Sequence, residues 1–305
     1  MLRVTSNMMN SQLLLNLNRN ARTMNDTQLQ LASGRKINKP SDDPVGITYS
    51  LRYRAELSSN EQYTRNVDGA LSWLDYNDTV LGQAGDVVQR LRELTVKAST
   101  GSNPQSALDS INEEVLQLKQ QLVDVSNSKL NGKYIFNGEK YDTKPYDFAK
   151  GTDGSYDTSK PVTTDSGQIQ YIVGEGVQMP INMTGNDVFG HTGDSDNLFS
   201  IINNISDALK KGDLTAITGQ LDNIDTRVET ILSARAEIGA KTNRVELMQD
   251  RLSDLNINLT DLQAKTEDAD YEELIMKSKI QENIYNASLS VGAKIISTTL
   301  VDFIR

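Results

Sequence analysis

His191 is the only histidine in the 305-residue chain, which contains no cysteine, and it is the first candidate for a chemical role. It lies in Gly190–Gly193, and a lone histidine in a glycine-rich segment is typical of a solvated loop. Without a second histidine or a cysteine, an ordinary zinc site lacks its ligands. Gly174–Gly176 begins like a dinucleotide-binding loop, but Met179 stands where the third glycine is needed. Neither segment predicts a site.

Three residues have the spacing of the first ligands in a calcium-binding loop: Asp153, Ser155 and Asp157. Such a loop needs a glycine at its sharp turn and an acidic residue to close the coordination, and this chain has Thr158 and Thr164 at those positions. Other carboxylate pairs are expected by chance among 41 acidic residues. The sequence therefore predicts no metal, no cofactor and no enzymatic activity.

The composition limits the partners. The formal charge of −10 argues against nucleic acid, because phosphate binding needs clustered lysine and arginine. The chain has no run of about 18 apolar residues that could span a membrane, and its start, Met1–Asn7, lacks the apolar run of a secretory signal. We expect neither nucleic acid nor a membrane as a partner, and export, if it occurs, by a route that reads no cleaved signal.

Helix breakers divide the chain into three parts. Proline is absent before Pro40 and after Pro180, and ten of the 20 glycines lie between Gly132 and Gly193. Long helical flanks with a loop-rich centre are therefore expected.

Apolar residues recur in both flanks at alternating spacings of three and four. Such a 3.5-residue period is typical of a coiled-coil seam. It predicts a mainly α fold, in which the N- and C-terminal segments form an elongated, antiparallel, coiled-coil-like bundle. The residues at this spacing are Leu14, Leu17, Ala21, Met24, Leu31, Ile111, Val115, Leu118, Leu122, Val125, Ile217, Leu221, Ile224, Val228, Ile231, Val245, Met248, Leu252, Leu255, Leu259, Leu262 and Ala269.

The centre has the signals of a small β-rich insert. Asn131-Gly132 and Asn137-Gly138 are favoured hairpin turns, and strand-like runs follow at 133–136, 169–173 and 177–179. From Tyr134 to Asn197 there are four basic and ten acidic residues, a net charge of −6. We interpret this stretch as an acidic surface insert with few apolar residues, dispensable for the folding of the flanks. A secreted hydrolase with a metal site in the insert stays a remote alternative.

The segment Leu31–Gly46 is a well-made connection between two helices. Gly34 suits the position after a helix end, where φ is positive. Asp43 can cap a helix that begins at Pro44, which has no N–H to lose there, and Asp42 also suits the positive end of the helix dipole.

Three motifs in order give the chain a resemblance to a known family. The loop Ser33–Asp43 resembles the N-terminal signature of the flagellin family, with its Ser-Gly, basic residue, Ile-Asn and paired aspartates. Arg235–Arg244 resembles the family's returning C-terminal helix, and Glu267–Tyr271 resembles its acidic break before the last helix. The resemblance covers residues 1–140 and 200–305.

The resemblance implies a structural subunit of the bacterial flagellum. The form of the loop at Lys39–Pro44, the opening Arg3–Met9 and the ending Ser297–Arg305 are similar to hook–filament junction subunits, apart from Val301 where leucine is usual. It implies that identical chains form a ring between another hook-associated junction protein and the flagellin filament. It also implies an extracellular protein that the flagellar type III apparatus exports without a cleaved signal, with a possible export chaperone. A flagellin filament subunit is the alternative.

The two ends are the predicted assembly interface. Past Asp270 apolar residues lie on several helix faces, which one partner helix cannot bury, and asparagines make the first helix a poor helix former. We therefore expect both ends to be weakly ordered in the free chain and to fold when they dock on neighbouring subunits. The alternative is that the N- and C-terminal segments simply pair with each other within one chain. The predicted interface residues are Leu14, Leu17, Met24, Leu31, Arg35, Ile37, Asp42, Asp43, Ile280, Ile284, Leu289, Val291, Ile296, Leu300 and Phe303.

The expected domain division follows these signals. It comprises an N-terminal assembly helix and loop, the first half of a helical rod, the β-rich insert, the second half of the rod and a C-terminal assembly helix. Their ranges are 1–44, 45–133, 134–197, 198–268 and 269–305.

Overall fold

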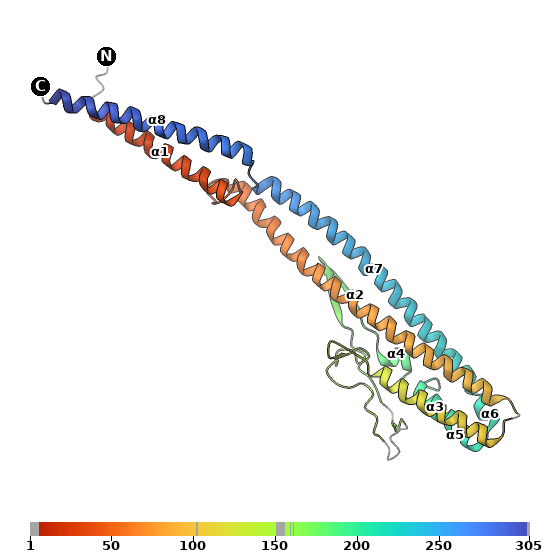
Figure 1. The fold of residues 1–305 in the computed structure, drawn as a ribbon. Helices are drawn as coiled ribbons and strands as arrows, with labels where there is room; N and C mark the ends of the chain where they lie inside the picture. Colours follow the sequence, from red (N-terminus) through yellow and green to blue (C-terminus); the bar gives the residue numbers. More distant parts are fainter. Residues whose placement is uncertain (1–5, 102, 151–155, 159, 161, 304–305) are drawn as a thin grey trace. The chain divides into compact units, whose positions relative to one another are not determined.

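The structure is a computed structural model that describes residues 6–101, 103–150, 156–158, 160 and 162–303, with the backbone alone at 6–7 and 295–303. The helices and strands of these residues are shown in Figure 1. The helices are α1 (Ser6–Ser33), α2 (Pro44–Ser99), α3 (Gln105–Ser126), α4 (Gly185–Phe189), α5 (Leu198–Lys211), α6 (Leu214–Thr218), α7 (Leu221–Glu267) and α8 (Tyr271–Phe303). The strands are β1 (Lys129–Leu130), β2 (Lys133–Tyr134), β3 (Gln170–Gly174) and β4 (Val177–Pro180), paired antiparallel as β1–β2 and β3–β4. The prediction of a mainly α fold with long helices and small strand pairs is confirmed.

The chain forms two compact units. The terminal unit consists of Met1–Ser59 and Asp254–Arg305, and the central unit is Asn60–Ser253. The helices α2 and α7 each begin in one unit and end in the other.

Apolar side chains with a period of seven residues build the core of the central unit. Such a period keeps one stripe of each helix facing its partner. On α2 one buried heptad position contains Val67, Leu74, Leu81 and Val88, and a second contains Ala70, Ala84, Leu91 and Ala98. On α7 the buried stripe consists of Ile224, Ile231, Ile238, Val245 and Leu252. Asn60 Nδ2 donates to the Leu252 carbonyl at 2.9 Å and Gln249 Nε2 to Asp68 Oδ1 at 2.8 Å, which fixes the register of the two helices at this end of the unit.

The predicted seam of α7 is wrong at two positions in the terminal unit. Leu255 and Leu262 are 43% and 42% exposed. The stripe that continues from the buried Leu259 passes through the half-buried Gln263 to the buried Glu267. Leu255 and Leu262 each precede an inward position, 256 and 263, by one residue, so they lie beside this stripe and not on it.

The predicted surface insert contributes to the central core, which the sequence interpretation did not expect. Phe136 and Phe189 meet edge to face with ring centroids 5.1 Å apart, and Tyr146 and Phe148 each lie 5.0 Å from the ring of Phe199. The same hydrophobic core includes Ile135, Val173, Met179, Ile181, Met183 and Val188 from this stretch. The insert therefore covers its own apolar residues with helices α3, α5 and α7 instead of standing in water.

One of the two predicted hairpin turns is correct. Asn131 and Gly132 have φ of 50° and 80° and join β1 to β2 as a two-residue turn. Asn137 and Gly138 instead form an irregular turn in which Lys140 N donates to the Asn137 carbonyl at 2.9 Å. The strand predicted at 133–136 ends at Tyr134, because the side chains of Ile135 and Phe136 are buried in the core.

Candidate functional site

The candidate site lies in the terminal unit, where the ends of α1 and α7 meet the starts of α2 and α8. Gly34 ends α1 with φ of 72°, and its N–H donates to the Gln30 carbonyl at 2.8 Å. A Cβ on Gly34 would lie 2.8 Å from the Tyr271 hydroxyl oxygen. Only glycine satisfies both the positive φ and this close approach.

Asp42 holds the loop after Gly34 in a tight turn. Its Oδ2 accepts hydrogen bonds from the Asn38 and Lys39 backbone N–H groups, at 3.0 and 2.8 Å. These bonds, first that from Lys39, lower the pKa of the Asp42 carboxyl. The carboxylate therefore acts within its own loop.

Asp43 caps α2. Its Oδ1 accepts from the Val45 and Gly46 N–H groups at 3.0 and 2.9 Å, and α2 begins at Pro44. Ile37 is buried beneath this cap, and a Cβ on Gly46 would lie 2.6 Å from its Cδ1 atom. The sequence predicted this helix start correctly.

Glu267, the last residue of α7, is the buried ion at the centre of the site. Its carboxylate is 2% exposed, and it accepts hydrogen bonds from Arg54 Nε at 2.8 Å, Arg54 Nη2 at 2.5 Å and the Ser50 hydroxyl. Arg35 Nε lies 3.4 Å from Oε2. The hydrogen bond from Arg54 is the main cause that lowers the pKa of Glu267 to about 2, so the carboxylate stays charged.

Backbone hydrogen bonds close the same junction. Lys36 N donates to the Glu267 carbonyl at 2.7 Å, and Ala269 N donates to the Gly34 carbonyl at 3.1 Å. Lys36 Nζ reaches the Lys265 carbonyl at 2.8 Å. Segments separated by more than 200 residues are thus tied into one structure around Glu267. The sequence interpretation recognised Glu267 as part of a motif but missed its role, because its partners are distant in the sequence.

Helices α1 and α8 lie side by side (Figure 1), and the residues of α8 that face α1 are unusually polar. The inward positions of α8 are Leu274, Ser278, Gln281, Tyr285, Ser288 and Gly292. The inward positions of α1 are Asn10, Leu13, Leu17, Asn20, Met24, Thr27 and Leu31. Asn20 Nδ2 donates weakly to Ser288 Oγ at 3.4 Å, whereas Asn10 Oδ1 and Gln281 Oε1 are buried without a hydrogen-bond partner.

The outward faces of the same two helices carry the large apolar side chains. Each of these side chains is at most two-thirds exposed. On α8 the large apolar side chains therefore lie mainly outside the seam, the reverse of a soluble amphipathic helix, whereas α1 also places four large apolar side chains in the seam. The exposed residues are Met8, Met9, Leu14, Leu15 and Leu29 on α1, and Ile275, Met276, Ile280, Ile284, Leu289 and Val291 on α8.

The structure places the predicted interface residues in three environments. Leu17, Met24 and Leu31 are half-buried in the α1–α8 seam, and Ile37 is buried in the loop. Arg35, Asp42 and Asp43 are exposed, but each interacts within the terminal unit. Leu14, Ile280, Ile284, Leu289 and Val291 are exposed on the outward faces, while Ile296, Leu300 and Phe303 lie outside the described side chains.

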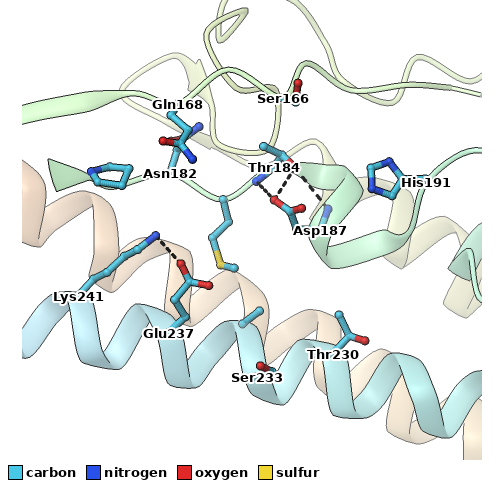
Figure 2. A pocket seen from close by; sticks show the side chains of 13 residues that line it. Ser166, Gln168, Asn182, Thr184, Asp187, His191, Thr230, Ser233, Glu237 and Lys241 are labelled. Carbon is cyan, nitrogen blue, oxygen red and sulfur yellow. Dashed lines mark hydrogen bonds and ion pairs between the residues drawn. The ribbon is translucent and has the colours of Figure 1, made fainter.

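A polar groove of about 570 Å³ lies in the central unit between α7 and the insert (Figure 2). Glu237 and Lys241 line it from α7 and form an ion pair at 2.9 Å. Opposite them, Asp187 accepts from the Thr184 hydroxyl at 2.7 Å, so the charged groups of the groove already have partners nearby. His191 is exposed at its edge.

No group of three or more acidic or histidine side chains that could hold a metal ion occurs within the described part of the chain. Asp153 and Ser155 of the calcium-like pattern lie outside the described residues. Likewise, none of the described helices is both long and apolar enough to cross a membrane.

Two family models match the chain. The bacterial flagellin N-terminal helical region matches residues 4–141, and the C-terminal helical region matches residues 221–304. The chain belongs to the flagellin family. The predicted resemblance is confirmed, and the protein is a structural component of the bacterial flagellum.

Similar proteins within the family include junction and filament proteins. Flagellar hook-associated protein 3 of Escherichia coli (strain K12) is 25% identical over 290 residues, which cover 85% of this chain and 86% of that protein. Flagellin of Bacillus subtilis (strain 168) is 28% identical over 255 residues and covers 79% of each chain.

Solved structures share the fold. A flagellar hook-associated protein from Vibrio parahaemolyticus has a TM-score of 0.66 at 22% identity and covers 74% of this chain and 100% of its own. Bacillus cereus FlgL has a TM-score of 0.57, also at 22% identity, and the match covers 70% of this chain and 99% of that protein. Together the comparisons support the prediction of a hook–filament junction protein over the alternative of a filament subunit.

Proposed function

We propose that this chain is a subunit of a ring that connects the flagellar hook to the filament, and that it assembles through the outward faces of α1 and α8. The observation that carries the proposal is the inverted polarity of α8. In α8, Ile280, Ile284 and Leu289 face outward, while Gln281, Tyr285 and Ser288 face α1.

Burial of the outward side chains gives the free energy for assembly. Removing one large aliphatic side chain from water stabilises by roughly 1.5–3 kcal/mol. Because Leu289 faces a different direction around the helix from Ile280, Ile284 and Val291, a single neighbouring helix cannot cover them all. Several neighbouring subunits can, as in a ring of identical chains.

The polar seam supports a free chain whose ends are only weakly ordered. The buried amide oxygens of Asn10 and Gln281 lack partners, and each such group destabilises the pair by about 1–3 kcal/mol. We propose that α1 and α8 gain their order on docking. Deuterium exchange of the free chain tests this: amides 6–33 and 275–303 exchange much faster than those of the α2 and α7 stripes in the central unit. Equal protection of both sets of amides contradicts the proposal.

The remaining parts of the proposal concern partners and location. The subunit joins another hook-associated junction protein on the hook side and flagellin on the filament side. It is extracellular and leaves the cell through the flagellar export apparatus without a cleaved signal, with a dedicated chaperone. It binds neither nucleic acid nor membrane, and it has no catalytic activity or cofactor.

A filament subunit is the second candidate, favoured by the match to Bacillus subtilis flagellin over 79% of the chain. Abundance separates the two candidates, because a filament subunit dominates sheared flagella and a junction subunit is a trace component. A secreted metal-dependent hydrolase has no observation in its favour among the described residues.

A deletion strain tests the proposed junction role. Cells without this protein make hooks, lack filaments and release flagellin into the medium, and a plasmid copy restores the filaments. Filaments of normal number in the deletion strain contradict a junction role. Hooks without filaments and without flagellin in the medium point instead to the loss of the filament subunit itself.

A further inference from the structure

The chain contains two Asn-Gly pairs in contrasting environments. In such a pair the backbone nitrogen of the glycine can attack the side-chain carbonyl carbon of the asparagine, because glycine has no Cβ to block the approach. Only four residues, 133–136, separate the two pairs, Asn131-Gly132 and Asn137-Gly138, in β1–β2 and the turn that follows. We propose that Asn131 is a site of spontaneous deamidation in the folded protein and that Asn137 is protected.

Asn131 is exposed at the tip of a hairpin that opens easily. The hairpin has two residue pairs, Lys129 with Tyr134 and Leu130 with Lys133, so few backbone hydrogen bonds hold the turn at its tip. A Cβ on Gly132 would meet no atom within 4 Å, so the space around the reacting atoms is open. Local opening of the turn lets the Asn131 side chain and the Gly132 nitrogen reach the reactive geometry.

Asn137 is held in place. Its side chain is 6% exposed, and Nδ2 donates to the carbonyls of Lys140 and Thr143 at 3.0 Å and to Thr143 Oγ1 at 2.9 Å. Its Oδ1 accepts from Asp165 N at 3.1 Å. The preceding Phe136 is fully buried in the central core. Reaction at Asn137 would break these hydrogen bonds and move a core side chain.

The chemistry is a substitution followed by hydrolysis. The Gly132 nitrogen loses its proton and forms a bond to Cγ of Asn131, and ammonia leaves from Cγ, which gives a five-membered cyclic imide. Water then opens the imide at either carbonyl, so that residue 131 becomes aspartate or isoaspartate. One water is consumed and one ammonia is released. Isoaspartate adds a carbon to the backbone of the two-residue turn and thereby marks the older copies of the protein.

Trypsin separates the two sites. Cleavage after Lys129, Lys133 and Lys140 gives one peptide with Asn131, residues 130–133, and one with Asn137, residues 134–140. The purified full chain is incubated at mildly alkaline pH, digested at intervals, and analysed by mass spectrometry with chromatographic separation of isoaspartate. We expect the first peptide to convert faster by on the order of a hundredfold, because a buried, hydrogen-bonded side chain opens far more rarely than an exposed turn.

The denatured chain is the control. In concentrated urea both peptides convert at similar rates, which shows that the structure causes the difference. Equal rates in the folded chain, a faster rate at Asn137, or no conversion of the folded chain while the denatured chain converts each overturns the proposal. Conversion of Asn131 to aspartate alone also overturns it, because the cyclic imide yields both products.

Discussion

The central and terminal units use the same seven-residue helix period, but the inward residues are aliphatic in the central unit and partly polar in the terminal unit. In the central unit the inward stripes are aliphatic, as at Leu74 and Leu81 on α2 and Ile231 on α7. In the terminal unit the inward positions include Gln281 and the charged Glu267, while Ile284 and other large apolar side chains face outward. Both units therefore share the period, and residue type decides whether a unit is complete by itself.

This difference separates folding from assembly. An apolar seam is stabilised by its own burial, whereas a polar seam with an apolar exterior gains most of its stabilisation from a neighbour. Under the proposed function, the central unit is the stable part of the subunit and the terminal unit is its connector. Four kinds of change to the chain test this division, in order of their expected effect on the stability of the free chain.

The largest effect is expected from removing the insert from the central unit. Joining Phe136 to Asn197 by a short glycine-serine linker deletes Tyr146, Phe148 and Phe189 from the core. We expect the shortened chain to lose cooperative unfolding, as measured by circular dichroism during heating. The sequence interpretation expected the opposite result, so an unchanged melting transition would restore the view of an independent surface insert.

A single cavity in the same cluster gives the next largest effect. Phe189→Ala removes a fully buried ring that packs against Phe136 and Tyr146, and we expect it to lower the free energy of unfolding by about 3–5 kcal/mol. Ile172→Ala, at a half-exposed position of the same insert, is the control, and we expect it to change the free energy of unfolding by less than about 0.5 kcal/mol. Urea titrations of the full chain measure both. Equal effects would show that the aromatic cluster is not the core of this unit.

Glu267→Gln tests the buried ion of the terminal unit. It leaves Arg54 with a neutral partner, and we expect a loss of about 1–3 kcal/mol in local stability. The readout is deuterium exchange at the amides of Lys36 and Ala269, which close the junction around Glu267. Glu56→Gln is the control: it breaks an exposed ion pair with Arg52 in the same unit, and we expect it to lower the local stability by less than about 0.5 kcal/mol.

The pH dependence of the same amides sharpens this test. Because the pKa of Glu267 falls from 4.5 to about 2 on folding, its contribution is fully present above about pH 5 and is lost as the pH falls toward 2. Protection of Lys36 and Ala269 should therefore decline over this range in the natural chain. The Glu267→Gln chain should lack this decline, and a decline that persists there would assign it to another carboxylate.

The sequence predicted helices and their starts well, because those depend on neighbouring residues. The cap at Asp43, the start at Pro44 and the positive φ of Gly34 all follow from local patterns. The pairing of Arg54 with Glu267 did not, since it joins residues 213 positions apart. The burial of the insert was missed for a similar reason: eight of the chain's 17 aromatic residues lie between Tyr134 and Asn197, but only the fold packs Phe136 against Phe189, and Phe189 against Phe199 of α5.

The smallest effect on the free chain is expected on the outward face of α8, where the effect on assembly is the largest. Ile284→Asp and Leu289→Asp place charges at positions that are 47% and 45% exposed, so the free energy of unfolding changes by less than about 0.5 kcal/mol. In the assembled ring the same charges would be buried without a partner, which costs several kcal/mol.

Asn286→Asp adds a charge at an exposed polar position of the same helix and is the matched control. Complementation of a deletion strain, scored by filaments per cell, measures assembly. We expect filaments with Asn286→Asp and none with the other two variants. Filaments with all three would place the contacts between subunits elsewhere, on the loop at residues 34–46 or on the side chains of Leu300 and Phe303.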